Sequence, residues 1–149
     1  MSAPIPPEII AAAKAAQAKW SIPASISIAQ WAVESGRGQH MPPGSLNPFG
    51  YKAVAGQPSV MVRTHEYIHG RYVSILAPFR KFASLAEAFD EHGRLLATAQ
   101  PYAAARAKLP NADAFADALT GVYATDPHYG ATLKSVMRGG NLYQYDGGA

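Results

Sequence analysis

The sequence predicts an α+β fold in which a mainly helical body carries one β-hairpin after its second helix. Apolar residues recur at spacings of three and four on both sides of the hairpin, as on the buried face of a helix. Two β-rich runs are separated by His69-Gly70, a pair typical of a tight turn. Hydrophobic residues make up 48% of the 149 residues, so we expect one core and one domain over residues 1–149.

The first half of the chain predicts two helices. An alanine-rich run over residues 8–20 follows two prolines, which suit a first helical turn. Ser21 is predicted to cap the N-terminus of the second helix, with Pro23 in its first turn. The glycines at 36 and 38 are expected to end that helix.

The middle of the chain predicts a loop and the hairpin. Residues 39–57 are rich in Pro, Gly, Ser and Asn, as loops are. The runs over residues 60–68 and 71–76 predict the two strands. Because an isolated hairpin is only marginally stable in water, we expect this one to pack against the helices or to flank a cleft.

The last third of the chain predicts three more helices. The capping-box pattern Ser84-Leu-Ala-Glu87 opens a helix that runs to about Ala99. A second helix is expected over residues 113–120. Asp126-Pro127 is predicted to cap a final helix that stops at Gly139-Gly140.

Composition excludes several kinds of site. The chain has no cysteine, which rules out disulfides, thiolate zinc sites and cysteine nucleophiles. The formal net charge is +3, and the 13 basic residues are spread along the chain, so acidic partners are favoured without a nucleic-acid-binding patch. We see neither an export signal nor a membrane-spanning run. The five histidines lack zinc-ligand spacing, and we expect no metal and no cofactor.

Glu34 is the first residue to weigh for catalysis. It lies at the C-terminal end of an apolar helix, where the helix dipole disfavours a negative charge. Burial beside Trp31 or Phe49 would add to that effect and favour the protonated carboxyl that a general acid needs. Position alone leaves open the alternative that Glu34 is a solvent-facing residue at a helix end.

Five motifs in collinear order resemble glycoside hydrolase family 73, the flagellar-type and autolysin-type endo-β-N-acetylglucosaminidases of the lysozyme-like superfamily. In that family a helix ends in a glutamate followed by Ser-Gly-x-Gly, as Glu34 is followed by Ser-Gly-Arg-Gly here. The resemblance covers about residues 5–138. The matching segments are Ile22–Gly38, Leu46–Lys52 (similar to Asn-Leu-Phe-Gly-Ile-Lys), Thr64–Tyr67 (Thr-x-Glu-Tyr), Phe79–Ser84 (Phe-Arg-x-Tyr-x-Ser) and Tyr123–Tyr129 (the late tyrosine motif).

The resemblance implies a lysozyme-like fold whose hairpin lobe flanks a cleft. It implies that Glu34 is the proton donor and that Glu66, from the hairpin motif, is its partner across the sugar. A substrate-assisted mechanism, in which the N-acetyl group of the sugar replaces the second carboxylate, stays open. Tyr123 is implied as a third catalytic residue near the sugar, and Tyr129 as a second aromatic contact. The alternative for both tyrosines is core packing, and for Glu66 it is a solvent-facing strand position.

Three further residues are implied to bind substrate. Asn47 would bond the N-acetyl group, Phe49 would line the pocket, and Tyr67 matches the hairpin motif. The alternative for Asn47 is a turn residue and for Phe49 a core residue. This loop departs from the family pattern at Pro48 and Tyr51, which puts its contacts in doubt but not the chemistry.

The function implied is cleavage of β-1,4 bonds after N-acetylglucosamine in peptidoglycan. Two rivals are a muramidase or lytic transglycosylase acting on the same polymer, and a non-catalytic glycan-binding module. We expect a monomer that acts in the periplasm or outside the cell and binds neither nucleic acid nor membrane. Phage release, specialised secretion with an immunity protein as partner, and a housekeeping autolysin are all consistent settings. The start Met-Ser-Ala-Pro looks like a native N-terminus.

Overall fold

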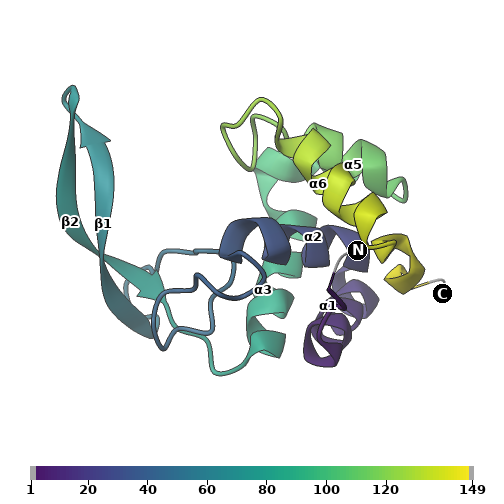
Figure 1. Cartoon of the computed structure of the whole chain (residues 1–149), viewed down its shortest axis with the longest axis horizontal. Helices are drawn as coiled ribbons and strands as arrows, with labels where there is room; N and C mark the ends of the chain where they lie inside the picture. Colours follow the sequence, from purple (N-terminus) through teal and green to yellow (C-terminus); the bar gives the residue numbers. More distant parts are fainter. Residues whose placement is uncertain (1–2, 148–149) are drawn as a thin grey trace.

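The computed structural model describes residues 3–147, so the two residues at each end of the predicted domain lie outside the described residues. The α+β prediction is confirmed: helices pack into one body, and a two-stranded antiparallel hairpin projects from it (Figure 1). Within residues 3–147, none of the helices is long and apolar enough to cross a bilayer. The elements are α1 (Pro7–Trp20), α2 (Ala24–Ser35), β1 (Ser59–Ile68), β2 (Arg71–Arg80), α3 (Leu85–Thr98), α4 (Ala103–Arg106), α5 (Ala112–Ala118) and α6 (Tyr129–Gly139), with 3₁₀ turns η1 (Gln100–Tyr102) and η2 (Leu142–Tyr145).

Helix α2 lies at the centre of the helical body. Figure 1 shows α1 and α3 on one side of it and α5 and α6 on the other. Every residue from Ala24 to Trp31 is buried, polar ones included. Three phenylalanines, Phe82, Phe89 and Phe115, are among the largest side chains of the surrounding core. A helix buried on all sides has few alternative positions, so whatever α2 carries at its end is held firmly.

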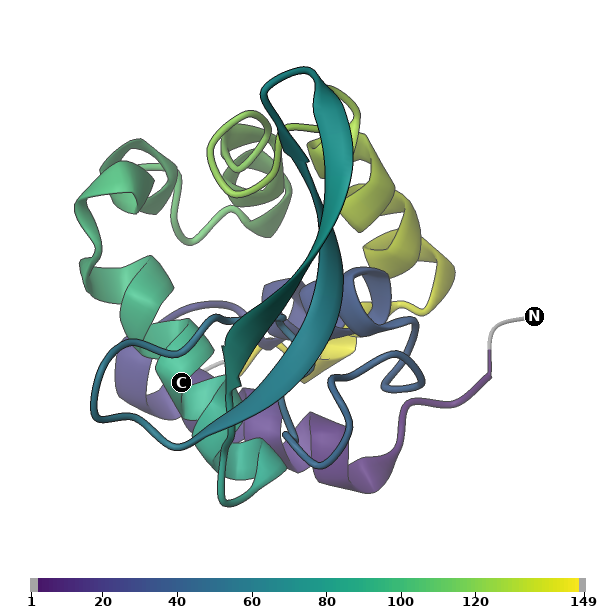
Figure 2. The ribbon, with the colours of Figure 1, turned by 90° about the vertical axis from the view of Figure 1, so that its left-hand side faces the viewer.

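The hairpin stands clear of the helical body in Figure 1, and in Figure 2, turned by 90°, the same hairpin lies in front of the helices. His69 and Gly70 form the predicted turn with φ angles of 52° and 82°. Strand β2 runs to Arg80, four residues further than predicted, because a proline at 78 is tolerated in a two-stranded ribbon whose strands are both edges. Of the two predicted arrangements, packing on the helices holds only near the base of the hairpin, where Ala77 is buried, and not at its tip (Figure 1).

Two predicted helix starts differ from the structure. Ser21 does not cap α2 but ends α1, with a left-handed φ of 64° and its N–H bonded to Gln17. The chain has to reverse between the two helices, and one left-handed residue achieves this. Asp126 accepts a hydrogen bond from the N–H of His128 at 2.8 Å, one residue before α6 begins. The sequence analysis also missed the short elements between residues 100 and 106, which are too brief to show a helical period.

Candidate active site

The Glu-Ser-Gly-Arg-Gly segment builds the end of α2. Gly36 takes a left-handed φ of 57° and donates its N–H to the carbonyl of Ala32. The buried Ser35 hydroxyl donates to the carbonyl of Trp31 at 2.6 Å and accepts from the N–H of Gly38 at 2.8 Å. These bonds satisfy groups that a helix end leaves free and fix the last turn of α2. Glu34, the residue just before them, therefore has a defined place.

Glu34 is exposed rather than buried beside Trp31 or Phe49. Its carboxylate instead accepts a hydrogen bond from the hydroxyl of Tyr129, with 2.7 Å between Oε1 and the phenol oxygen. Tyr129 opens α6 and is only 3% exposed. Burial raises the pKa of Tyr129 well above its ordinary value, with the bond to Glu34 acting in the same direction. Tyr129 is therefore a neutral donor held against the carboxylate.

Tyr123 lies behind Tyr129 rather than on Glu34. The two rings stack at a centroid distance of 5.8 Å and an interplanar angle of 10°. The hydroxyls of Tyr123 and Tyr51 are buried, and neither makes a hydrogen bond of ordinary geometry within the described residues. Burial raises the pKa of both phenols, which interact with each other and with Glu34. Tyr51 replaces the aliphatic residue of the family pattern and thus adds a second buried phenol to the site.

Gln30 and His92 support the site from the core, and the sequence analysis missed both. Gln30 Nε2 donates to the Tyr129 hydroxyl at 2.9 Å, and Gln30 Oε1 lies 2.7 Å from Nε2 of His92. Burial lowers the pKa of His92 to about 3. The available signal was spacing: Gln30 precedes Glu34 by four residues and so shares its helix face. His92 falls on the apolar face of α3.

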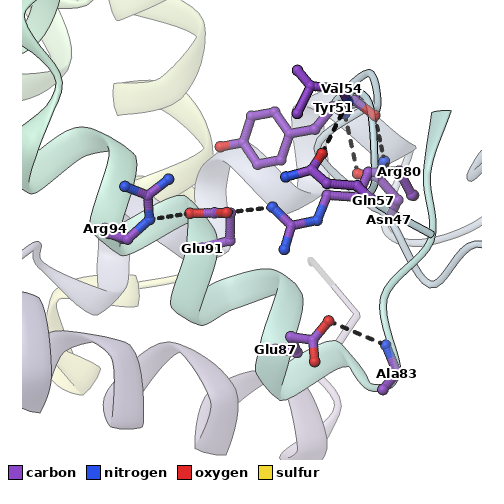
Figure 3. A network of polar contacts seen from close by, with 9 residues as sticks. All are labelled: Asn47, Tyr51, Val54, Gln57, Arg80, Ala83, Glu87, Glu91 and Arg94. Atoms are coloured by element: carbon purple, nitrogen blue, oxygen red, sulfur yellow. Dashed lines mark hydrogen bonds and ion pairs between the residues drawn. The ribbon is translucent and has the colours of Figure 1, made fainter. Parts of the chain in front are cut away.

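The loop before the hairpin is held together by Asn47, which is fully buried. Its amide donates to the carbonyls of Tyr51 and Arg80 at 2.8 and 3.0 Å, and its Oδ1 accepts from the N–H of Tyr51 (Figure 3). Both amide hydrogens are thus used within the chain, which favours the turn interpretation of Asn47. Phe49 is 6% exposed and stacks on His92 at 4.2 Å, as a core residue does. Their contacts with substrate stay predictions.

An ion-pair network joins the base of the hairpin to α3. Glu91 accepts from Arg80 at the end of β2 and from Arg94 one turn along the helix (Figure 3). Burial opposes the charge on Glu91, but the hydrogen bonds from the two arginines outweigh it and lower the pKa of this carboxyl. The hairpin base is thereby anchored on the same helix that carries His92.

Glu66 lies on the hairpin three residues before the turn. Its carboxylate pairs with Lys52, with 3.1 Å between Oε1 and Nζ, and no bond within the described residues joins it to Glu34. Tyr67 points to the opposite face of the ribbon, is 65% exposed and meets Tyr72 edge-on at 5.1 Å. The structure therefore groups Glu34, Tyr129 and Tyr123, and leaves the two hairpin residues apart from them.

Comparison with known proteins assigns the family. The glucosaminidase family, described as mannosyl-glycoprotein endo-beta-N-acetylglucosaminidase, matches residues 10–142. The chain belongs to this family. The resemblance to glycoside hydrolase family 73 is thus confirmed, and with it the assignment of the chain as a glycoside hydrolase domain.

Several known proteins are similar to this chain in sequence and in fold. An autolysin of Enterococcus faecalis is 39% identical over 132 residues, which is 83% of this chain and 18% of that protein. The peptidoglycan hydrolase FlgJ of Salmonella typhimurium is 35% identical over 85% of this chain and 42% of its own length. The catalytic domain of the autolysin Auto from Listeria monocytogenes superposes with a TM-score of 0.83 and 29% identity, covering 93% of this chain and 83% of that one.

The chain matches only part of the length of these curated relatives. The chain spans about a fifth of the Enterococcus autolysin and 30% of a Lactococcus lactis relative that is 37% identical over 83% of this chain. A C-terminally truncated glycoside hydrolase domain of Salmonella typhimurium FlgJ, a separate solved structure, is covered over 92% of its length with a TM-score of 0.74 and 33% identity, and that match spans 89% of this chain. The lysozyme-like fold that the motifs implied is thereby confirmed.

Proposed function

We propose that this chain is an endo-β-N-acetylglucosaminidase that cleaves the β-1,4 bonds after N-acetylglucosamine in peptidoglycan strands, with Glu34 as general acid. The observation that carries the proposal is the exposed Glu34 carboxylate, fixed at the end of a buried helix and bonded to a neutral tyrosine. Relatives named autolysin and peptidoglycan hydrolase support the choice of polymer.

The chemistry requires one proton donor and one water. Glu34 passes its proton to the glycosidic oxygen as the bond from that oxygen to the anomeric carbon breaks. Positive charge develops on the sugar, and water then adds to the anomeric carbon. The proton that this water loses restores the carboxyl of Glu34 directly or through a second base, so one water is consumed for each bond cleaved. No metal or cofactor is required for these steps.

Glu66 is the candidate for the second group. Its pairing with Lys52 suits a base or an electrostatic stabiliser better than an acid. Because Glu66 lies on a hairpin that stands away from the helices, this role requires the hairpin to close over the bound glycan. In the substrate-assisted alternative, the N-acetyl oxygen attacks the anomeric carbon and Glu66 is dispensable.

The test is digestion of purified peptidoglycan followed by mass spectrometry. We expect products with reducing N-acetylglucosamine ends from the wild-type chain, and release about 100- to 10,000-fold slower from Glu34→Gln, which keeps the shape of the side chain but has no acid proton. Circular dichroism should show that this variant is folded. Substantial cleavage by Glu34→Gln would remove Glu34 from the proposal, and absence of cleavage by the wild type would favour a glycan-binding module.

A second candidate function is an N-acetylmuramidase. It is favoured by the relative from Lactococcus lactis, which is named a probable N-acetylmuramidase and is 37% identical over 131 residues. The same digestion separates the two: products with reducing N-acetylmuramic acid ends support the muramidase, and anhydro sugars support a lytic transglycosylase.

The setting is also part of the proposal. The chain acts as a monomer on peptidoglycan in the periplasm or outside the cell, reaching it by phage release or specialised secretion, with an immunity protein as partner in the second case. Fractionation of the producing cells and size-exclusion chromatography test these points. A chain that stays in the cytoplasm throughout growth and lysis contradicts the location.

A further inference from the structure

A chain of hydrogen bonds runs from the core of the helical body to the exposed carboxylate of Glu34. His92 Nε2 lies 2.7 Å from Gln30 Oε1, and Gln30 Nε2 lies 2.9 Å from the Tyr129 hydroxyl. That hydroxyl lies 2.7 Å from Glu34 Oε1. Gln30 and His92 have no exposed surface, so neither touches a substrate. Their hydrogen-bonded route to Glu34 passes through Tyr129.

Each hydrogen bond in this chain has a defined donor and a defined acceptor. His92 stays neutral near neutral pH because burial lowers its pKa to about 3, and a neutral imidazole carries one N–H. Gln30 Oε1 only accepts, so that hydrogen lies on Nε2 of His92, and Nδ1, 3.5 Å from the Ser27 hydroxyl, is left as an acceptor. With its oxygen taken, Gln30 presents its N–H to Tyr129. The single proton of Tyr129 is then directed to Glu34.

Packing alone does not account for this pair. An amide and an imidazole without exposed surface destabilise a core unless each polar atom is bonded. Here the bonds of Gln30 and His92 are made with each other, with Tyr129 and with Ser27. Apolar side chains of similar volume would fill the same space without that requirement. What the polar pair adds is a fixed orientation of the Tyr129 hydroxyl.

We propose that Gln30 and His92 are positioning residues that direct the Tyr129 hydroxyl onto Oε1 of Glu34, so that Oε2 is the oxygen that carries the acid proton. The inference rests on the proposed glycosidase function, in which Glu34 is the acid. With Oε1 occupied, a proton on Oε2 is held in one place relative to the glycosidic oxygen. Loss of either positioning residue leaves Tyr129 free to rotate its hydroxyl, and the acid proton is then shared between two oxygens.

Four variants test this. Gln30→Leu and His92→Phe remove the polar atoms with little change in volume. His92→Gln is the rescue variant, because its amide can donate to Gln30 as the imidazole does. Ser25→Ala is the control: Ser25 is equally buried on the same helix, but its bonds go to Asp146 at 2.7 Å, away from the site.

The kinetic assay uses soluble glycan strands freed from purified peptidoglycan. We expect Gln30→Leu and His92→Phe to lower kcat about 10- to 100-fold with KM within about twofold, as for a misplaced catalytic group. The alkaline limb of the kcat profile should move to higher pH, because the charged form of Glu34 loses a donor. His92→Gln should recover most of kcat, and Ser25→Ala should keep both kcat and the profile.

A double-mutant cycle with Tyr129→Phe separates positioning from general destabilisation. If Gln30 acts through Tyr129, Gln30→Leu lowers kcat no further when Tyr129 has no hydroxyl. Full additivity overturns the inference, as does a folded Gln30→Leu with wild-type kcat and pH profile. If Gln30→Leu and His92→Phe fail to fold, Tyr129→Phe decides: positioning requires its hydroxyl on Glu34, so an unchanged kcat and pH profile in Tyr129→Phe overturns the inference.

The inference and the proposed function fail separately. If the wild type does not cleave glycan strands, the function falls, and the positioning is then read without turnover from an NMR titration of the Glu34 side-chain carboxyl. Positioning is supported if the midpoint differs from the wild-type value in Gln30→Leu and in His92→Phe, and lies closer to the wild-type value in His92→Gln. A midpoint that is the same in all four chains overturns it.

Discussion

The two acidic residues of the site sit in opposite surroundings. Glu34 ends a helix whose first eight residues are all buried, and a bonded chain of Tyr129, Gln30 and His92 backs its carboxylate. Glu66 lies near the tip of a hairpin that stands clear of the helices (Figure 1), and within residues 3–147 its carboxylate is bonded to Lys52 alone. One carboxylate is therefore placed before substrate arrives, whereas the other depends on where the hairpin lies.

This difference indicates a division of labour. Polar groups that packed helices hold in place can stabilise the charge of the transition state without first having to reorient. This electrostatic preorganisation is usually the largest single contribution to catalysis. A two-stranded ribbon with few buried contacts opens and moves at low cost in free energy. We infer that the helical body provides the acid chemistry and that the hairpin closes on the glycan.

The largest contrast is expected between the two carboxylates themselves. Glu34→Gln should lower kcat about 100- to 10,000-fold, the usual contribution of a general acid. Glu66→Gln should lower kcat less, about 10-fold, because the loosely placed group contributes less to the transition state. Both are measured with soluble glycan strands and compared in kcat and KM. Equal losses in the two variants would contradict the division of labour.

The next effect is the pH dependence of stability in the helical body. The pKa of His92 is about 3 in the folded chain and about 6.5 when unfolded, so the unfolded chain takes up the proton first as the pH falls. The stability linked to His92 is complete above about pH 6.5 and decreases toward pH 3, by up to about 1.4 kcal/mol per pH unit. Urea unfolding of the wild type and His92→Phe measures this. An equally steep slope in His92→Phe would contradict it, because carboxyl groups of lowered pKa such as Glu91 contribute the same amount in both chains.

A matched pair of glycines compares the two regions directly. Gly36 and Gly70 have φ angles of 57° and 82°, so alanine costs about 1–2 kcal/mol at either. A Cβ at Gly36 would lie 2.5 Å from Cδ2 of His40, whereas nothing lies within 4 Å at Gly70. Gly36→Ala should lower activity about tenfold, since it displaces the turn that fixes Glu34, while Gly70→Ala should leave activity within about twofold.

The control for that pair is His40→Ala. It removes the side chain that a Cβ at Gly36 meets, and it should restore part of the stability of Gly36→Ala. Thermal unfolding and glycan cleavage are measured on Gly36→Ala, Gly70→Ala, His40→Ala and the double variant Gly36→Ala/His40→Ala. If Gly70→Ala lowers activity as much as Gly36→Ala, the tip of the hairpin is as constrained as the end of α2.

Much of the fold follows from the sequence because its signals are local. The apolar period of α2, the capping box at Ser84 and the His69-Gly70 turn each depend on a few neighbouring residues, and the structure has all three. Glu34 and the tyrosine motif are likewise found by pattern. Which of the two tyrosines contacts Glu34 was not predictable, because it depends on which ring the packing of α6 brings to that carboxylate.

The supporting residues could not be predicted for a related reason. His92 lies 62 positions from Gln30, and only the packing of α3 on α2 joins them. As a sequence feature, His92 is one of five histidines without metal-ligand spacing. The position of Glu66 relative to Glu34 could not be predicted for a different reason. The hairpin signal fixes strand and turn, but the angle at which a ribbon leaves the body is set by loop residues such as Asn47.

The smallest effect is expected at the ion pair of the hairpin. Lys52 and Glu66 keep 56% and 35% of their side chains exposed, whereas Arg80 and Glu91 keep 20% and 12%. Lys52→Met should change the free energy of unfolding by less than about 0.5 kcal/mol, as for exposed pairs, and less still at high salt. Glu91→Gln should cost at least about 1 kcal/mol, because it leaves the half-buried Arg80 without its charged partner. Urea unfolding at low and high salt measures both, and a larger loss in Lys52→Met would mean that the hairpin is held against the body more firmly than its exposure indicates.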